Sequence, residues 1–197
     1  MPPDIVVLDT CVLISSVLRR LLLRLADQAC FRPAWSDVIG QEWRRNAARL
    51  WDAPAEDVAR QWAELQQAFP LADQGDVAAF KQGLRHSDPK DWHVIAAARA
   101  VLAGQPGASV AVVTRNVRDF NRSELRRLGL ALLDPDQLLV RCWASRADSV
   151  RAAFAQIEQE LVLEGKPVEP LEVVLKRERL FRLNKLCAAR HGEAAGL

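Results

Sequence analysis

The sequence predicts an α/β fold with a mostly parallel central sheet, because strand-like and helix-like patterns alternate along the chain. Short apolar runs occur at 5–8, 110–114 and 130–133, and segments with apolar residues at helical spacing lie between them. Runs without polar alternation are typical of strands that are buried on both faces of a parallel sheet. After residue 135 the pattern is helical only. We therefore expect a sheet-containing domain over 1–135 and a helical extension over 136–197, packed on or beside it.

The first half of the chain supplies one strand and several helices. A stretch rich in Leu and Arg predicts a helix over 12–28, and 30–33 could supply one more strand. Ser36 is expected to cap a helix that runs to residue 50, because its hydroxyl can accept a hydrogen bond from a free N–H of the first turn. A further helix is expected over 55–69, where apolar residues recur every three or four positions.

The second half alternates in the same way. A short helix is expected over 76–84, and a turn over 86–90 leads to an Ala-rich helix that Asp91 opens and that runs to residue 103. Another short helix is expected over 123–128. In the extension, a Gly-Lys-Pro break at 165–167 separates one amphipathic helix from the next.

Composition excludes several classes of protein. The chain has 197 residues, half of them hydrophobic, and a net charge of +2, which argues against a disordered chain and a strongly basic nucleic-acid coat protein. The four cysteines lie far apart without a C-x-x-C pair, so a zinc ribbon and a disulfide framework are unsupported. No apolar stretch reaches the ~18 residues of a membrane helix. We expect a cytoplasmic protein with no membrane segment.

Four acidic residues fall where the sites of parallel α/β proteins form, at or near the carboxyl ends of strands. Asp9 ends the first strand, and Asp119 lies five residues beyond the second. Asp91 begins a helix, where the helix dipole favours a carboxylate. Glu42 lies inside a helix between apolar neighbours. Each acid alone has an ordinary structural explanation as a turn, cap or solvated residue, but their joint arrangement favours a common site.

Three segments together resemble the PIN-domain ribonucleases, the fold of VapC-type toxins. They are VLDTCVLIS at 7–15, DPKDWHVIAAA at 88–98 and VVTRNVRDF at 112–120. They stand in the order and spacing of the family's opening strand, central acidic helix start and final acidic loop. The resemblance covers roughly residues 4–135, and it implies a PIN-like, Rossmann-like α/β/α sandwich.

The resemblance also implies a set of site residues. Asp9, Glu42, Asp91 and Asp119 would be the catalytic acids that hold Mg²⁺ or Mn²⁺, with Thr10, Thr114, Asn116 and Asp88 around them. Cys11 stands where relatives carry Asn or a small residue, which changes the local hydrogen bonding. Asn116 stands where many relatives have another Asp, so the site would hold one negative charge less.

Independent of the family, the chemistry of the acids is consistent with this interpretation. Mg²⁺ and Mn²⁺ prefer oxygen ligands, and clustered carboxylates raise one another's pKa unless a cation is present. A bound ion lowers the pKa of a coordinated water and stabilises charge on a phosphate. Arginines near the acids, Arg45, Arg115 and Arg118 among them, would bind RNA phosphates. The expected activity is a metal-dependent endoribonuclease that leaves, as in the family, a 5′-phosphate and a 3′-hydroxyl.

Alternative functions differ in what they require of the sequence. A haloacid-dehalogenase-type phosphatase needs a second Asp where Cys11 stands, and a cysteine phosphatase needs an Arg six residues after its Cys, which none of the four cysteines has. The resemblance implies the toxin of a type II toxin–antitoxin pair, with RNA and a cognate antitoxin as partners and a homodimer as a further expectation. A PIN nuclease of RNA processing without an antitoxin, and a non-catalytic PIN-fold interaction module, stay open; the four acids argue against the module.

Overall fold

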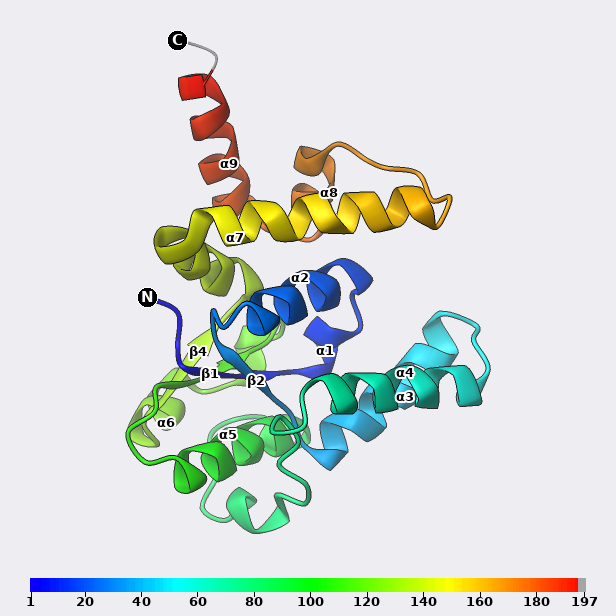
Figure 1. The fold of residues 1–197 in the computed structure, drawn as a ribbon. Helices are drawn as coiled ribbons and strands as arrows, with labels where there is room; N and C mark the ends of the chain where they lie inside the picture. Colours follow the sequence, from blue (N-terminus) through cyan, green and yellow to red (C-terminus); the bar gives the residue numbers. More distant parts are fainter. Residues whose placement is uncertain (195–197) are drawn as a thin grey trace. The chain divides into compact units, whose positions relative to one another are not determined.

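A four-stranded parallel sheet lies at the centre of the α/β architecture seen in the computed structural model, which describes residues 1–194, with side chains to residue 189 (Figure 1). The strands are β1 (Ile5–Leu8), β2 (Arg32–Ala34), β3 (Val110–Val113) and β4 (Leu130–Leu133). They lie in the order β2-β1-β3-β4, and each neighbouring pair is parallel. The predicted α/β class with a parallel sheet and the three apolar strands are therefore confirmed, and β2 lies close to the additional strand considered at 30–33.

Helices account for most of the remaining described chain. They are α1 (Thr10–Leu13), α2 (Ser16–Asp27), α3 (Asp37–Leu50), α4 (Ala55–Ala68), α5 (Trp92–Gly104), α6 (Arg122–Arg127), α7 (Pro135–Leu163), α8 (Leu171–Arg177) and α9 (Phe181–Ala194). Short 3-10 turns are η1 (Ala78–Lys81), η2 (Pro89–Asp91) and η3 (Val117–Asp119).

Local details of the prediction were wrong at several places. The helix expected after the break at 165–167 is two helices, α8 and α9, and Arg179 between them has a φ of +61°. The helix expected over 12–28 is broken into α1 and α2, at a point where two serines follow each other and favour helix ends over helix interiors. The helix expected over 76–84 is only η1, because the Asp76 carboxylate accepts the Ala78 N–H in a local turn and Gly83 has a φ of +85°. Ser36 does precede α3, but its side chain makes no capping hydrogen bond.

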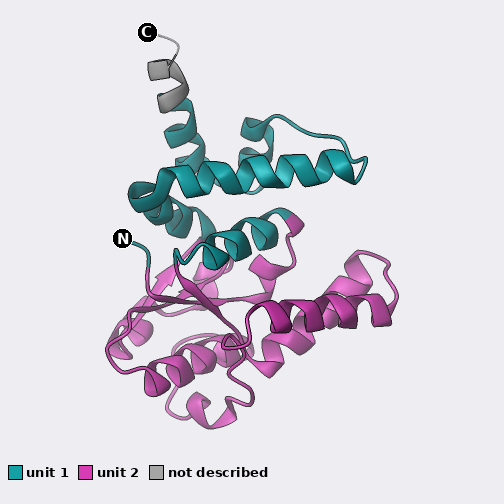
Figure 2. Ribbon diagram, in the orientation of Figure 1, with its two compact units in different colours: residues 1–2, 17–30, 135–197 teal, residues 3–16, 31–134 magenta. Residues whose placement is uncertain are grey.

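The contacts divide the chain into two compact units (Figure 2). Unit 2 comprises residues 3–16 and 31–134 and contains the sheet. Unit 1 comprises residues 1–2, 17–30 and the chain from 135 onward. The boundary expected after residue 135 lies one residue from one of these limits, whereas 17–30 belongs with the C-terminal helices and not with the sheet. The expected domains 1–135 and 136–197 stay a prediction.

Unit 2 is built around α5, which packs against β1, β2 and β3 (Figure 1). Three consecutive alanines at 96–98 are fully buried and let the helix approach the sheet closely. The hairpin of α3 and α4 is held by aromatic side chains: the Trp62 ring centroid lies 5.5 Å from that of Trp35 and 5.4 Å from that of Trp43. Gly40 of α3 makes room for Trp62, because a Cβ at this position would lie 2.6 Å from its ring.

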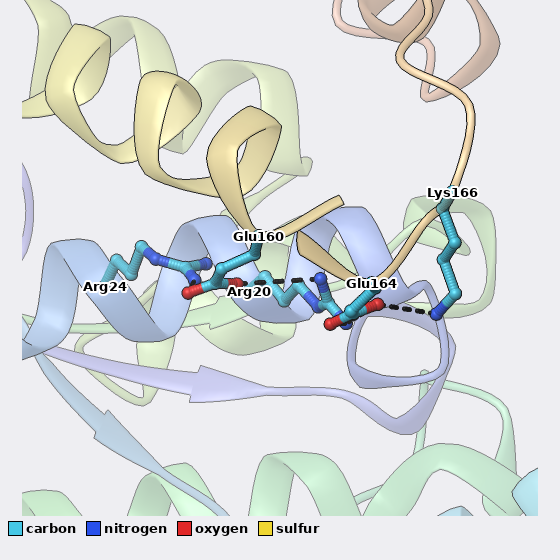
Figure 3. Close-up of polar contacts among 5 residues, drawn as sticks. All are labelled: Arg20, Arg24, Glu160, Glu164 and Lys166. Carbon is cyan, nitrogen blue, oxygen red and sulfur yellow. Dashed lines mark hydrogen bonds and ion pairs between the residues drawn. The ribbon is translucent and has the colours of Figure 1, made fainter. Parts of the chain in front are cut away.

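Unit 1 joins α2 to the three C-terminal helices. Arg20 and Arg24 of α2 lie alongside Glu160 and Glu164, and Lys166 approaches Glu164 from beyond the end of α7 (Figure 3). The Arg20–Glu164 and Lys166–Glu164 ion pairs are 2.9 and 2.7 Å long. Nowhere in the described chain is a helix long and apolar enough to cross a membrane.

The close contact between Gly40 and Trp62 predicts a large effect of a single methyl group. Gly40→Ala should lower the free energy of unfolding by about 1–3 kcal/mol, because the added Cβ overlaps the Trp62 ring. Gly104→Ala is the matched control: a Cβ there meets nothing within 4 Å, and the better helix propensity of Ala should raise stability by up to about 1 kcal/mol. Urea denaturation measures both, and a Gly40→Ala protein as stable as the wild type would contradict the packing described.

Candidate active site

Asp9 and Thr114 meet at the carboxyl ends of β1 and β3. Leu8 pairs with Val113 in the parallel ladder, so Asp9 and Thr114 leave the sheet side by side. The Asp9 N–H donates to the Val113 carbonyl at 3.1 Å, and the Thr114 hydroxyl donates to Asp9 Oδ2 at 2.6 Å. Both side chains are buried, with exposed fractions of 5% and 0%. The Asp9 carboxylate is therefore held at the edge of the sheet in one orientation.

Cys11 takes part in the same arrangement. Its thiol donates to Asp9 Oδ2 at 3.1 Å and lies 3.4 Å from the Thr114 hydroxyl, and its sulfur accepts the Arg115 N–H at 3.2 Å. Burial and the nearby Asp9 carboxylate raise the pKa of Cys11 to about 12, so the group is a neutral thiol. Cys11 therefore adds a weak hydrogen-bond donor to Asp9 without adding a charge.

Glu42 of α3 faces two partners from elsewhere in the chain. The Thr10 hydroxyl donates to its Oε2 at 3.1 Å, and His93 Nε2 lies 3.2 Å from the same oxygen. Partial burial raises the pKa of Glu42, but His93, Thr10 and the charge of Arg45 outweigh it and hold this pKa below the ordinary value. Glu42 is thus an ionised acid, and the hydrogen bond from Thr10 orients it, as expected for a residue close to the acids.

His93 is the site residue that sequence reasoning missed. It lies in the first turn of α5, 4% exposed, with Nδ1 2.8 Å from the Lys90 carbonyl. A carbonyl only accepts, so Nδ1 carries a proton and Nε2 faces Glu42. Burial lowers the pKa of His93, but the carboxylates of Glu42 and Asp9 more than offset this and raise it above the ordinary value. The sequence offered no signal for this pair, because its two members lie far apart along the chain.

Asp91 differs from the other acids in lacking a donor. It ends η2 immediately before α5, is 9% exposed, and its Oδ2 is buried without a hydrogen-bond partner. Burial raises its pKa to about 6, with further contributions from the charges of Asp9, Asp119 and Asp88 against that of Lys90. An unpaired, buried carboxylate oxygen is costly and favours either a proton or a cation beside it.

Asp119 and Asp88 share one lysine. Lys90 Nζ lies 3.2 Å from Asp119 Oδ2 and 3.3 Å from Asp88 Oδ2, and its side chain is 63% exposed. The Asp88 N–H donates to the Asp119 carbonyl at 2.8 Å, which fastens the loop after β3 to the turn before α5. The exposed Lys90 ammonium therefore partly neutralises the charges of Asp88 and Asp119.

The remaining expected site residues lie at the surface. The Asn116 N–H donates to the Thr114 hydroxyl at 3.0 Å, and its side chain is exposed. Arg45, Arg115 and Arg118 are exposed.

The donor set can be compared with the needs of a metal ion. Among the residues that the structure describes, no three His, Cys, Asp or Glu side chains lie close enough together to hold a metal ion. A closed site of the zinc type is therefore not formed by these residues. Mg²⁺ instead keeps several waters and needs only one or two carboxylates beside a substrate phosphate. Asp9, oriented by Thr114, and Asp91, with its unpaired oxygen, suit a hard and partly hydrated ion.

The raised pKa of Asp91 predicts a stability change of defined sign. Folded Asp91 keeps its proton up to about pH 6, whereas an unfolded Asp releases it near 3.8, so stability falls as the pH rises through this interval. Asp91→Asn should therefore stabilise the metal-free protein by roughly 1–3 kcal/mol at pH 8 and have little effect at pH 4. Asp88→Asn, whose carboxyl has a lowered pKa, should not stabilise at pH 8. Urea titrations at both pH values measure this, and an Asp91→Asn protein less stable than the wild type at pH 8 would refute it.

In comparisons with known proteins, no family model, no curated protein and no solved structure matches the chain.

Proposed function

We propose that this chain is a Mg²⁺- or Mn²⁺-dependent endoribonuclease with a PIN-like α/β/α fold. The observation that carries the proposal is the Asp91 carboxylate, which is buried with one unpaired oxygen and whose pKa is raised by burial and by Asp9 and Asp119. A divalent cation would remove the electrostatic cost of this arrangement. The position of Asp9 and Asp119 beyond the carboxyl ends of the parallel strands β1 and β3 supports it, because α/β proteins bind their ligands there.

Asp9 and Asp91 would hold the cation, with Glu42 and Asp119 close by to bind its waters or a second ion. When bound, the ion supplies an activated water and stabilises the charge that develops on the phosphate. Thr114 and Cys11 orient Asp9 through their donors, and Thr10 and His93 fix Glu42. Arg45, Arg115 and Arg118 are exposed and would bind RNA phosphates beside the acids.

The proposed role in the cell rests on the family resemblance. We propose that the chain is the toxin of a type II pair in the cytoplasm and that a cognate antitoxin is its protein partner. RNA processing without an antitoxin would use the same chemistry at the same acids, and the two roles differ in the effect of the free protein on growth.

Cleavage of RNA tests the activity directly. With Mn²⁺, the purified protein should cleave a labelled single-stranded RNA, and EDTA should abolish cleavage. Asp9→Asn should lower the rate at least about a hundredfold, because several kcal/mol of charge stabilisation are lost with the ligand. Asp52→Asn is the matched control: Asp52 is an exposed turn residue with a φ of +48°, a conformation that Asn tolerates, so the rate should not change. Cleavage that persists in Asp9→Asn would come from a contaminant, and a wild type without cleavage would favour the interaction module.

Expression alone in a bacterial host tests the proposed cellular role. Growth should stop within a few generations of induction, and induction of Asp9→Asn at the same protein level should leave growth unchanged. The difference in colony-forming units between the two cultures is the measurement. A neutral effect of active wild-type protein would count against the toxin and favour RNA processing.

A further inference from the structure

One buried acid outside the expected site, Glu124 of α6, holds the turn that leads to Asp88 and Asp91. Its Oε1 accepts the N–H groups of Arg85 and His86, at 2.7 and 3.1 Å. Its Oε2 accepts both the N–H and the hydroxyl of Ser87, at 2.9 and 2.7 Å. Glu124 is 5% exposed. One carboxylate therefore fixes three consecutive backbone amides of the segment that enters η2.

The same carboxylate is tied to the loop that carries Asp119. The Ser87 hydroxyl accepts the Asn121 N–H at 2.9 Å, and Asn121 Oδ1 accepts the Glu124 N–H at 2.9 Å as the cap of α6. Glu124, Ser87 and Asn121 thus form a closed set of hydrogen bonds, which we call the Glu124 clamp. It joins the turn before α5 to the loop after β3.

The clamp needs a carboxylate. Burial raises the pKa of Glu124, but the donors from Arg85, His86 and Ser87 outweigh burial and hold this pKa below the ordinary value, so the group is ionised. All four of its donors are backbone N–H groups or a hydroxyl. A glutamine would keep one acceptor oxygen and direct an NH₂ group at N–H donors, which breaks half of the clamp.

We propose that Glu124 is a positioning residue of the nuclease site: it fixes where the proposed ligand Asp91 and the neighbouring Asp119 stand relative to each other, and through this it raises the affinity for the divalent cation. The inference rests on the proposed function. Asp88 and Asp91 follow the clamped turn directly, and Asp119 precedes Asn121 by two residues. The two acid-bearing segments are also joined by the Asp88 N–H, which bonds the Asp119 carbonyl at 2.8 Å. With the clamp loosened they would keep this bond but lose the contacts through Glu124 and Ser87, so their relative position would be less well fixed.

A matched control exists in unit 1. Asp136, at the start of α7, is 6% exposed and accepts the N–H groups of Arg182 and Leu183 at 2.8 and 3.0 Å. It is the same kind of buried carboxylate on backbone amides, but it joins helices that carry none of the proposed ligands. Loss of this contact should destabilise the chain without changing the cation site.

The experiment measures Mn²⁺ binding by calorimetry, and RNA cleavage against Mn²⁺ concentration, at a temperature where every variant is folded. Glu124→Gln should weaken Mn²⁺ binding about tenfold or more and shift half-maximal cleavage to correspondingly higher Mn²⁺, as is usual when a residue that supports metal ligands is changed. At saturating Mn²⁺ its KM for RNA should equal that of the wild type. Asp136→Asn should leave Mn²⁺ affinity unchanged. Ser87→Ala, which removes one of the four donors, should act in the same direction as Glu124→Gln and more weakly.

The outcomes separate the two proposals. If the wild type cleaves RNA and Asp9→Asn does not, but Glu124→Gln binds Mn²⁺ as tightly as Asp136→Asn, the positioning role is overturned and the proposed function stands. A wild type that binds no Mn²⁺ overturns both. If Glu124→Gln does not fold, Ser87→Ala decides: an Mn²⁺ affinity weakened severalfold supports the positioning role, and an unchanged affinity overturns it.

Discussion

The parallel pairing of β1 with β3 is the constraint on which the site depends. Because Leu8 pairs with Val113, both strands end at the same level and Asp9 meets the Thr114 hydroxyl at 2.6 Å. The two strands are buried at every position. A slip of the register by one residue would draw Asp9 or Thr114 into the apolar sheet without its partner, at a cost of several kcal/mol, so burial itself fixes where the polar residues emerge.

At that edge of the sheet, different kinds of side chain form hydrogen bonds or ion pairs with the acids. Thr114 and Thr10 donate hydroxyl hydrogen bonds to Asp9 and Glu42. The His93 imidazole faces Glu42, and the Lys90 ammonium forms ion pairs with Asp88 and Asp119. Asp91 has no such donor on its buried oxygen. Burial and the neighbouring carboxylates therefore act on Asp91, whose pKa is raised to about 6 and whose Oδ2 is unpaired. The cation proposed above would relieve this cost.

Much of the fold could be predicted from the sequence because its signals are local. Apolar runs predicted β1, β3 and β4, and helical spacing of apolar residues predicted α4. The Ser36 cap predicted α3, and the turn at 86–90 with the Ala-rich stretch after it predicted α5. The position of Asp9 at a strand end follows from the apolar run that precedes it. The His93–Glu42 pair and the Glu124 clamp join segments distant in sequence, and no spacing rule encodes such contacts. The break between α1 and α2 was missed because a continuous apolar pattern hid two serines that favour helix ends. The grouping of 17–30 with the C-terminal helices was missed because periodicity shows that a helix has an apolar face but not which segment covers it.

The order of the units along the chain has a consequence for folding. Apart from residues 1–2, unit 1 starts with the α2 segment and is completed only by α7, α8 and α9, with nearly all of unit 2 between them. Closing so long a loop costs chain entropy, although an already folded unit 2 shortens the effective loop. During synthesis from the N-terminus, α2 leaves the ribosome long before Glu160 and Glu164 exist to pair with Arg20 and Arg24. The nascent chain therefore carries the basic, Leu-rich α2 segment without its ion-pair partners until the final third has been made, and so short a segment is only marginally helical by itself.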